Sequence, residues 1–238
     1  ILRRLVLNFR VREMRLLFAI FLFSILIMPT HASESIGKIS ESAGKVQIKT
    51  IKAKRLKGVA GTQINVGDLV KVRKKSMAIL AMQDESKFQI SAKTTLVFDD
   101  FLYDASNQKM RVRIINGALT YDGKKLVPNN DRVFNTKGFT LTVRGTKFAG
   151  KFGPTSQIVL LKGAVGLSGK GQKEVLSGPM QSVIFDASGI GEPFKMSIIE
   201  VKAFFGEHNL NFDLLVGPKY QENISTGSKR CFGSNCGN

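Results

Sequence analysis

The sequence predicts an all-β protein, either an antiparallel β-sandwich or a short twisted β-solenoid of hairpins, with one short C-terminal helix. About a dozen short segments of alternating apolar and polar residues follow one another, at spacings of roughly 8 to 14 residues. Turns rich in Gly, Asn, Asp and Lys separate them, and no helix long enough to connect parallel strands lies between them. We therefore expect antiparallel hairpins, and both architectures remain open.

In the first predicted strands, apolar residues alternate with polar ones, so one side of each strand is expected to be buried. In the segment MRVRI, Met110 and Val112 point one way and Arg111 points the other, which is typical of a half-buried sheet. The dipeptide Asp122-Gly123 favours a tight turn, so we predict a β-hairpin there. The strands predicted in this part of the chain are 45–49, 68–73, 78–82, 87–91, 95–100, 110–114 and 117–121.

The later strands include one that is interrupted. Leu141 and Val143 alternate with polar residues until Gly145, and the apolar side resumes at Phe148. A glycine inside such a pattern usually marks a bulge or a bend, so we predict a kinked strand, with a ligand loop as the alternative. The strands predicted here are 132–136, 139–145, 146–152, 157–161, 164–168, 173–176 and 181–186.

The character of the chain changes after residue 191. A helix is expected to start at Pro193 and to end at Gly206 as its cap, because Ile198, Val201 and Phe205 recur at helical spacing. We expect this helix to pack on the edge or the end of the sheet, with binding to a partner as the alternative.

The last residues have the composition of a flexible terminus from about Ser225 onward. Both cysteines lie there, as Cys231 and Cys236. Outside the cytoplasm, two cysteines this close most often form a local disulfide, and dispensable thiols are the other option.

The N-terminal region has the pattern of a secretory signal. Arg15 precedes thirteen mostly apolar residues, 16–28, which are too few for a typical membrane span. Thr30 and Ala32 occupy the small-residue positions before a cleavage point, so we place the cut after Ala32, with a retained anchor as the alternative. No Cys follows the apolar segment directly, so a lipoprotein is not indicated.

The predicted organisation of the whole chain has four parts. They are 1–32 extension and signal peptide, 33–191 β domain, 192–224 helix and docking segment, and 225–238 tail.

The chain is strongly basic, with 36 Lys and Arg against 18 Asp and Glu. Residues 1–32 hold five Arg and one Glu, so the exported chain keeps 31 basic and 17 acidic side chains, a net charge of +14. Such a balance favours anionic partners such as envelope polymers, acidic lipids or acidic proteins rather than nucleic acid. A solvated basic surface without a dedicated ligand is the other interpretation.

No catalytic, metal-binding or cofactor-binding constellation is visible in the sequence. After Ala32 the only histidine is His208, which we expect at the surface. The pairs Asp84-Glu85 and Asp99-Asp100 are expected to be turn or strand-end residues, because neighbouring carboxylates point in different directions. We therefore expect a protein that is not an enzyme.

Five blocks follow one another in order across about residues 58–167: a Gly-Asp turn, an Ala-rich strand with its polar hairpin turn, a G-x-L strand, a V-R-G-T-x-F segment and a V-x-x-G-x-V pair. These blocks, in this order, resemble the FecR domain family. Glu85 departs from this pattern, since the family usually has Gly between the Asp and the Ser of that turn. The matching positions are Gly67, Asp68, Asp84, Ser86, Gly117, Thr136, Val143, Arg144, Gly145, Thr146, Phe148, Gly163 and Val165.

The resemblance implies a bacterial envelope protein. The best-understood members are transmembrane sensors, in which a cytoplasmic helical region binds a sigma factor and a periplasmic part responds to an outer-membrane transporter. Only thirteen residues precede Met14, so we expect the stand-alone exported module, in the periplasm or outside the cell, and not direct sigma-factor control. Its expected function is non-catalytic recognition of another envelope protein in sensing or assembly; the alternative is binding of an anionic polymer such as peptidoglycan or a polysaccharide. Gly145 is expected to allow the bend, with Arg144 and Thr146 bonding to neighbouring backbone.

Overall fold

The computed structural model describes residues 35–104, 106–123 and 129–216. The chain divides into one unit of residues 1–34 and a second, compact unit of residues 35–238, and the fold below is that of the second unit. The predicted signal segment and the cysteine pair Cys231 and Cys236 lie outside the described residues. Within the described residues, no helix has both the length and the apolar character to cross a membrane.

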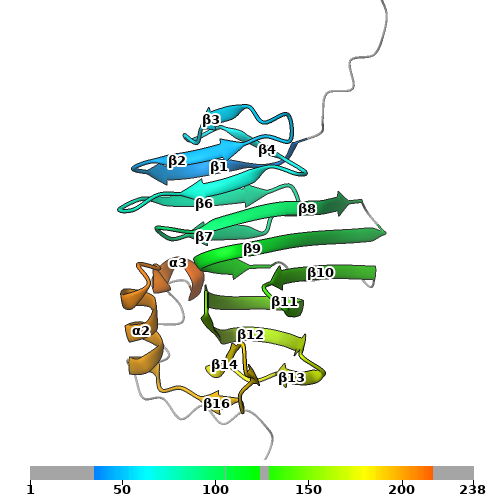
Figure 1. Cartoon of the computed structure of the whole chain (residues 1–238), viewed down its shortest axis with the longest axis vertical. Helices are drawn as coiled ribbons and strands as arrows, with labels where there is room; N and C mark the ends of the chain where they lie inside the picture. Colours follow the sequence, from blue (N-terminus) through cyan, green and yellow to red (C-terminus); the bar gives the residue numbers. More distant parts are fainter. Residues whose placement is uncertain (1–34, 105, 124–128, 217–238) are drawn as a thin grey trace, which may run out of the picture. The chain divides into compact units, whose positions relative to one another are not determined.

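Strands dominate the described chain, which confirms the predicted all-β class (Figure 1). Two short helices follow the strands, where one was predicted: α2 (Ile198–Glu207) and α3 (Phe212–Val216). The strands are β1 (Ser35–Ala43), β2 (Val46–Lys49), β3 (Arg55–Lys57), β4 (Gln63–Asn65), β5 (Leu69–Val72), β6 (Met77–Met82), β7 (Lys87–Ile90), β8 (Thr95–Tyr103), β9 (Asn107–Asp122), β10 (Asn129–Thr136), β11 (Phe139–Phe152), β12 (Thr155–Gly169), β13 (Gln172–Leu176), β14 (Gln181–Asp186), β15 (Gly189–Ile190) and β16 (Phe194–Lys195).

The strands form one continuous sheet that folds back on itself into two layers. Layer A contains β4, β1, β6, β7, β14, β15 and β16; layer B contains β3, β2, β5, β8, β10 and β13. Three long strands contribute one half to each layer: β9, β11 and β12. The fold thus combines the facing layers of a sandwich with the continuous winding of a twisted solenoid of hairpins.

Aromatic side chains from both layers meet in the core between them. Phe88 of layer A lies 5.6 Å from Phe98 of layer B, measured between ring centroids. Phe134 of layer B and Phe148 of layer A lie 5.2 Å apart. All four are fully buried and belong to one apolar cluster that spans the layers. Burying each such side chain stabilises the fold by about 1.5–3 kcal/mol, so this cluster holds the layers together.

The β-hairpin predicted at Asp122-Gly123 is wrong. β10 pairs in parallel with the start of β9, with Asn129 opposite Asn107, while all other strand pairs are antiparallel. The physical reason is that the end of β9 lies in layer A, where β7 and β11 already occupy both of its edges. The chain therefore crosses to layer B, and the Gly123 N–H donates to the Thr146 carbonyl.

The predicted bounds of the C-terminal helix are also wrong. Helix α2 begins after Ser197, whose hydroxyl accepts from the Glu200 N–H while the Glu200 carboxylate accepts from the Ser197 N–H. This capping box sets the start, and the residues that precede it form β16. Gly206 lies inside the last turn, and His208 is the C-cap.

Both helices pack on the outer side of layer A where β9, β11 and β12 form it, not on an edge or an end of the sheet (Figure 1). Val201, Phe204 and Phe205 of α2 are buried in a second apolar cluster with Ala118 and Val159 of layer A. The outer side of layer B has no such cover among the described residues.

Candidate functional site

The interrupted strand that the sequence singles out is a corner of the solenoid. β11 passes from layer B to layer A at Gly145, which has a φ of +57°. β12 turns beside it at Gly163, which has a φ of +87°. A Cβ at Gly163 would lie 2.5 Å from the Gly145 carbonyl oxygen, whereas a Cβ at Gly145 would meet no atom within 4 Å. Gly163 is therefore required for close approach, and Gly145 only for its backbone conformation.

Thr146 ties the two strands of this corner together. Its buried hydroxyl accepts from the Arg144 N–H at 3.0 Å and donates to the Ala164 carbonyl at 2.8 Å. On either side, Val143 and Phe148 point into the core. These residues of the V-R-G-T-x-F segment build the corner.

Arg144 is the exception within the V-R-G-T-x-F segment, because its side chain is exposed. It follows Thr140 and Thr142 on the outer side of layer B. Its backbone N–H is bonded, but in the described part of the chain its guanidinium makes no hydrogen bond or ion pair. Arg144 is thus the exposed charged residue of the V-R-G-T segment.

The other family positions also support turns. Asp68, after Gly67, is buried and accepts from the Asn65 N–H at 3.0 Å. Gly117, with a φ of +110°, is the corner at which β9 changes layers, and a Cβ there would overlap Thr94. Thr136 ends β10, and Val165 is buried in layer B.

The polar turn between β6 and β7 holds a buried ion pair that the sequence did not indicate. Asp84 accepts from the Ser86 N–H and hydroxyl, and its other oxygen lies 2.8 Å from Arg132 Nη2. The side chains of Asp84 and Arg132 are only 3% and 2% exposed. Arg132 comes from layer B and also donates to the Tyr121 hydroxyl at 2.7 Å, which joins the two layers. Glu85 adopts a φ of +62°, a left-handed backbone conformation that glycine adopts without strain.

Burial dominates the chemistry of this cluster. It raises the pKa of Tyr121 well above its ordinary value, despite the nearby Arg132. The phenol therefore stays neutral as an acceptor for the guanidinium. Because every polar group named here has a partner within the cluster, the arrangement is suited to holding the layers together.

The neighbouring carboxylates Asp99 and Asp100 each form an ion pair with a basic side chain. Asp99 binds Arg113 through two hydrogen bonds of 2.9 and 2.7 Å, which raises the pKa of Arg113. Asp100 lies 2.6 Å from Lys109. Across the described ranges, no group of three or more His, Cys, Asp and Glu side chains could hold a metal ion.

His208 is half-buried, not a freely exposed surface residue. Its ring packs edge-on against Phe204 at 4.6 Å, and its carbonyl accepts from the Ser91 hydroxyl. Burial, with a smaller contribution from Lys151, lowers the pKa of His208, against the opposing effect of Glu207. The imidazole is therefore neutral near pH 7.

The outer side of layer B has no helix packed on it among the described residues. Between β10 and β13 its side chains are short, so the surface is flat. We call this surface the layer B platform; its residues are Thr140, Thr142, Ala164, Gly166 and Ser168. Arg144 and Lys173 border the platform, and Val175 beside it is 64% exposed.

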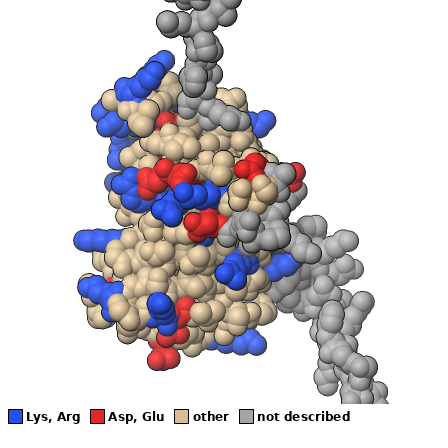
Figure 2. Space-filling model, turned by 90° about the vertical axis from the view of Figure 1, so that its right-hand side faces the viewer, with Lys and Arg blue, Asp and Glu red and all other residues tan. Residues whose placement is uncertain are grey.

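Charges at the neighbouring β8, β9 and β10 are largely balanced. Arg113, Lys109 and Arg111 each lie within 4 Å of an aspartate. Figure 2 shows acidic side chains gathered beside basic ones around the middle of this side of the molecule. The bordering cations of the platform, by contrast, have no ion pair within the described residues.

A known family matches part of the chain. The FecR protein family model matches residues 68–166, which run from the turn before β5 into β12. This segment matches the FecR domain. It includes all three corner glycines, Gly117, Gly145 and Gly163, and the buried Asp84–Arg132 pair.

No curated protein matches the chain. Among the solved structures that resemble it are two crystal structures of a "putative anti-sigma factor" from Parabacteroides distasonis ATCC 8503, at 1.65 and 2.50 Å resolution. Each has 15% sequence identity and a TM-score of 0.49 and covers 58% of this chain. The chain spans 64% and 63% of those two chains, less than two thirds of their length.

Proposed function

We propose that this protein is a non-catalytic, exported module that recognises another protein of the bacterial cell envelope, in a sensing or assembly role. The FecR domain indicates a regulatory or signalling function. The apolar segment 16–28 and the small residues after it support export to the periplasm or beyond the cell. No cofactor, metal or nucleic acid is needed for this role.

The layer B platform is the observation that carries the proposal. Small molecules bind mostly in concave pockets, whereas protein partners bury broad and rather flat surfaces. The platform is flat and uncovered, while helices cover the opposite side of the fold. A protein partner is therefore the occupant that fits it best.

The charge at the border of the platform narrows the class of partner. Arg144 and Lys173 are exposed and have no ion pair within the described residues. Arginine is among the residue types enriched at protein interfaces, where it can bind carboxylates through two hydrogen bonds. We therefore expect the partner to present an acidic surface.

A specific observation favours anionic polymer as the second candidate. Residues 45–75 contain ten Lys and Arg, and their single acidic residue, Asp68, is buried. On β2 and β3, Lys49 lies directly opposite Arg55, although like charges in this position destabilise a sheet. Peptidoglycan or an acidic polysaccharide would neutralise this end of the fold.

An affinity capture at two salt concentrations tests the proposal. The purified protein, its Arg144→Glu variant and a matched Lys195→Glu variant on β16 are presented to envelope extract. We expect a protein that is retained at high salt by the parent and by Lys195→Glu, and that Arg144→Glu loses. Retention of polysaccharide at low salt alone, equal for all three, would instead support the polymer candidate, because charge-driven contacts weaken steeply with ionic strength.

A further inference from the structure

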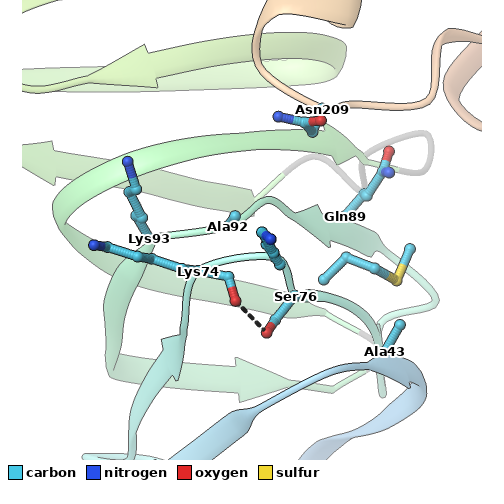
Figure 3. Close-up of a pocket in the computed structure, with 9 residues that line it drawn as sticks. Ala43, Lys74, Ser76, Gln89, Ala92, Lys93 and Asn209 are labelled. Carbon is cyan, nitrogen blue, oxygen red and sulfur yellow. Dashed lines mark hydrogen bonds between the residues drawn. The ribbon is translucent and has the colours of Figure 1, made fainter.

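A pocket beside the end of β1 lies where three turns meet (Figure 3). They are the turn between β5 and β6, the turn between β7 and β8, and the connection between α2 and α3. The cavity has a volume of about 540 Å³, large enough for one or two sugar rings. Its wall includes the methyl groups of alanine and methionine side chains.

The charge of the pocket is entirely positive. Lys74, Lys75 and Lys93 line it, and no carboxylate does. Figure 3 shows Lys74 and Lys93 beside one another on one side of the pocket, with Gln89 and Asn209 away from them. Among the described residues, none of the three lysines forms an ion pair. Their mutual repulsion is therefore relieved by solvent or by an anion.

The backbone of the pocket is held in an uncommon conformation. Lys75, Lys93 and Asn209 have φ values of +52°, +58° and +53°, in the left-handed region that glycine fills without strain. They are three of the seven non-glycine residues with positive φ in the described ranges. Strained residues of this kind cluster at binding sites, where the side chain gives a function that glycine cannot.

Gln89 supplies a buried donor without a partner. The residue is only 4% exposed, and its Oε1 accepts from the Asn211 N–H at 2.9 Å. That bond fixes the orientation of the amide, so Nε2 is the atom with two donor hydrogens. Within the described chain, Nε2 has no hydrogen-bond acceptor, and Gln89 is one of the residues that line the pocket. A buried donor left unsatisfied is costly, so an acceptor from outside the chain is expected there.

We infer that this pocket binds an acidic saccharide unit. The carboxylate or phosphate of the sugar would bind the ammonium groups of Lys74, Lys75 and Lys93. A hydroxyl or ring oxygen would accept from Gln89 Nε2, and the apolar side of the ring would pack on the methyl groups. This function goes beyond protein recognition, because the pocket is built by other turns than the layer B platform.

Calorimetric titration of the purified protein tests this inference. The probes are digalacturonic acid and glucose 6-phosphate, with cellobiose as the uncharged control. We expect at least one acidic sugar to bind and cellobiose to give no heat. The acidic sugar that binds better tells whether the natural group is a carboxylate or a phosphate. Failure of both acidic sugars to bind, or equal binding of cellobiose, would overturn the inference.

Substitutions of single lysines test whether the sugar binds in the pocket or only to the overall positive charge of the protein. Lys75→Gly and Lys93→Gly each remove one ammonium group at a position whose backbone favours glycine, so the fold is retained. We expect each to weaken binding by about tenfold, the cost of one hydrogen bond to a charged group. Lys170→Gly is the matched control, because Lys170 also has a positive φ of +53° and does not line the pocket. An equal loss of affinity in Lys170→Gly would contradict the assigned site.

Discussion

Replacement of Gly163 by alanine tests the corner at which β11 and β12 change layers. The added Cβ would lie 2.5 Å from the carbonyl oxygen of Gly145 and 2.8 Å from that of Arg144. Both contacts are with backbone, so no side chain can turn away. The left-handed conformation costs about 1–2 kcal/mol for any residue with a Cβ, and overpacking adds typically 1–3 kcal/mol. We expect the free energy of unfolding to fall by roughly 2–5 kcal/mol.

The matched control is Gly145→Ala in the same corner. Its φ of +57° is also positive, but its new Cβ would meet no atom within 4 Å. We therefore expect a loss of only about 1–2 kcal/mol. Both changes alter the unfolded chain alike, so the difference between them isolates the contact at Gly163. Urea unfolding with an unchanged slope measures both values, and a loss for Gly163→Ala no larger than that for Gly145→Ala would refute the reasoning.

Two further predictions concern the interior. Arg132→Met should lower the free energy of unfolding by about 3–5 kcal/mol, because it leaves Asp84 buried and charged without its cation; a loss below about 1 kcal/mol in thermal and urea unfolding would show that the pair is dispensable. The lowered pKa of His208 means that the folded state favours the neutral ring, so its contribution is present above the unfolded pKa near 6.5 and is lost as pH falls toward the folded pKa. His208→Gln should therefore lose less stability than the parent between pH 7.5 and 5, and identical pH profiles would contradict the burial of this ring.

Structural features that depend only on a residue's own backbone or on its immediate neighbours could be predicted from the sequence. Alternation around Met110 and Val112 predicted a strand with one buried side, and the structure has both side chains buried in β9. Gly145 predicted a kink, and the strand turns its corner there. These features are local, so the pattern of a few residues contains them.

Features that depend on distant pairing could not be predicted in the same way. Asp122-Gly123 has the composition of a hairpin turn, but the strand before it already has two neighbours in layer A. Arg132 sits in an alternating segment where an arginine is normally exposed, and only the fold brings it to Asp84. The pocket around Lys75 and Lys93 joins turns separated by more than a hundred residues from Asn209, so no sequence motif marks it.

Site-specific photocrosslinking on the layer B platform measures the proposed recognition most directly. A photoreactive residue replaces Thr142 at the centre of the platform, and in a control protein it replaces Lys202 on helix α2, on the opposite side of the fold. Irradiation of cells that express each protein should give a defined adduct with one envelope protein from position 142, and none from position 202. No adduct at position 142, or the same adducts from both positions, would contradict protein recognition through layer B.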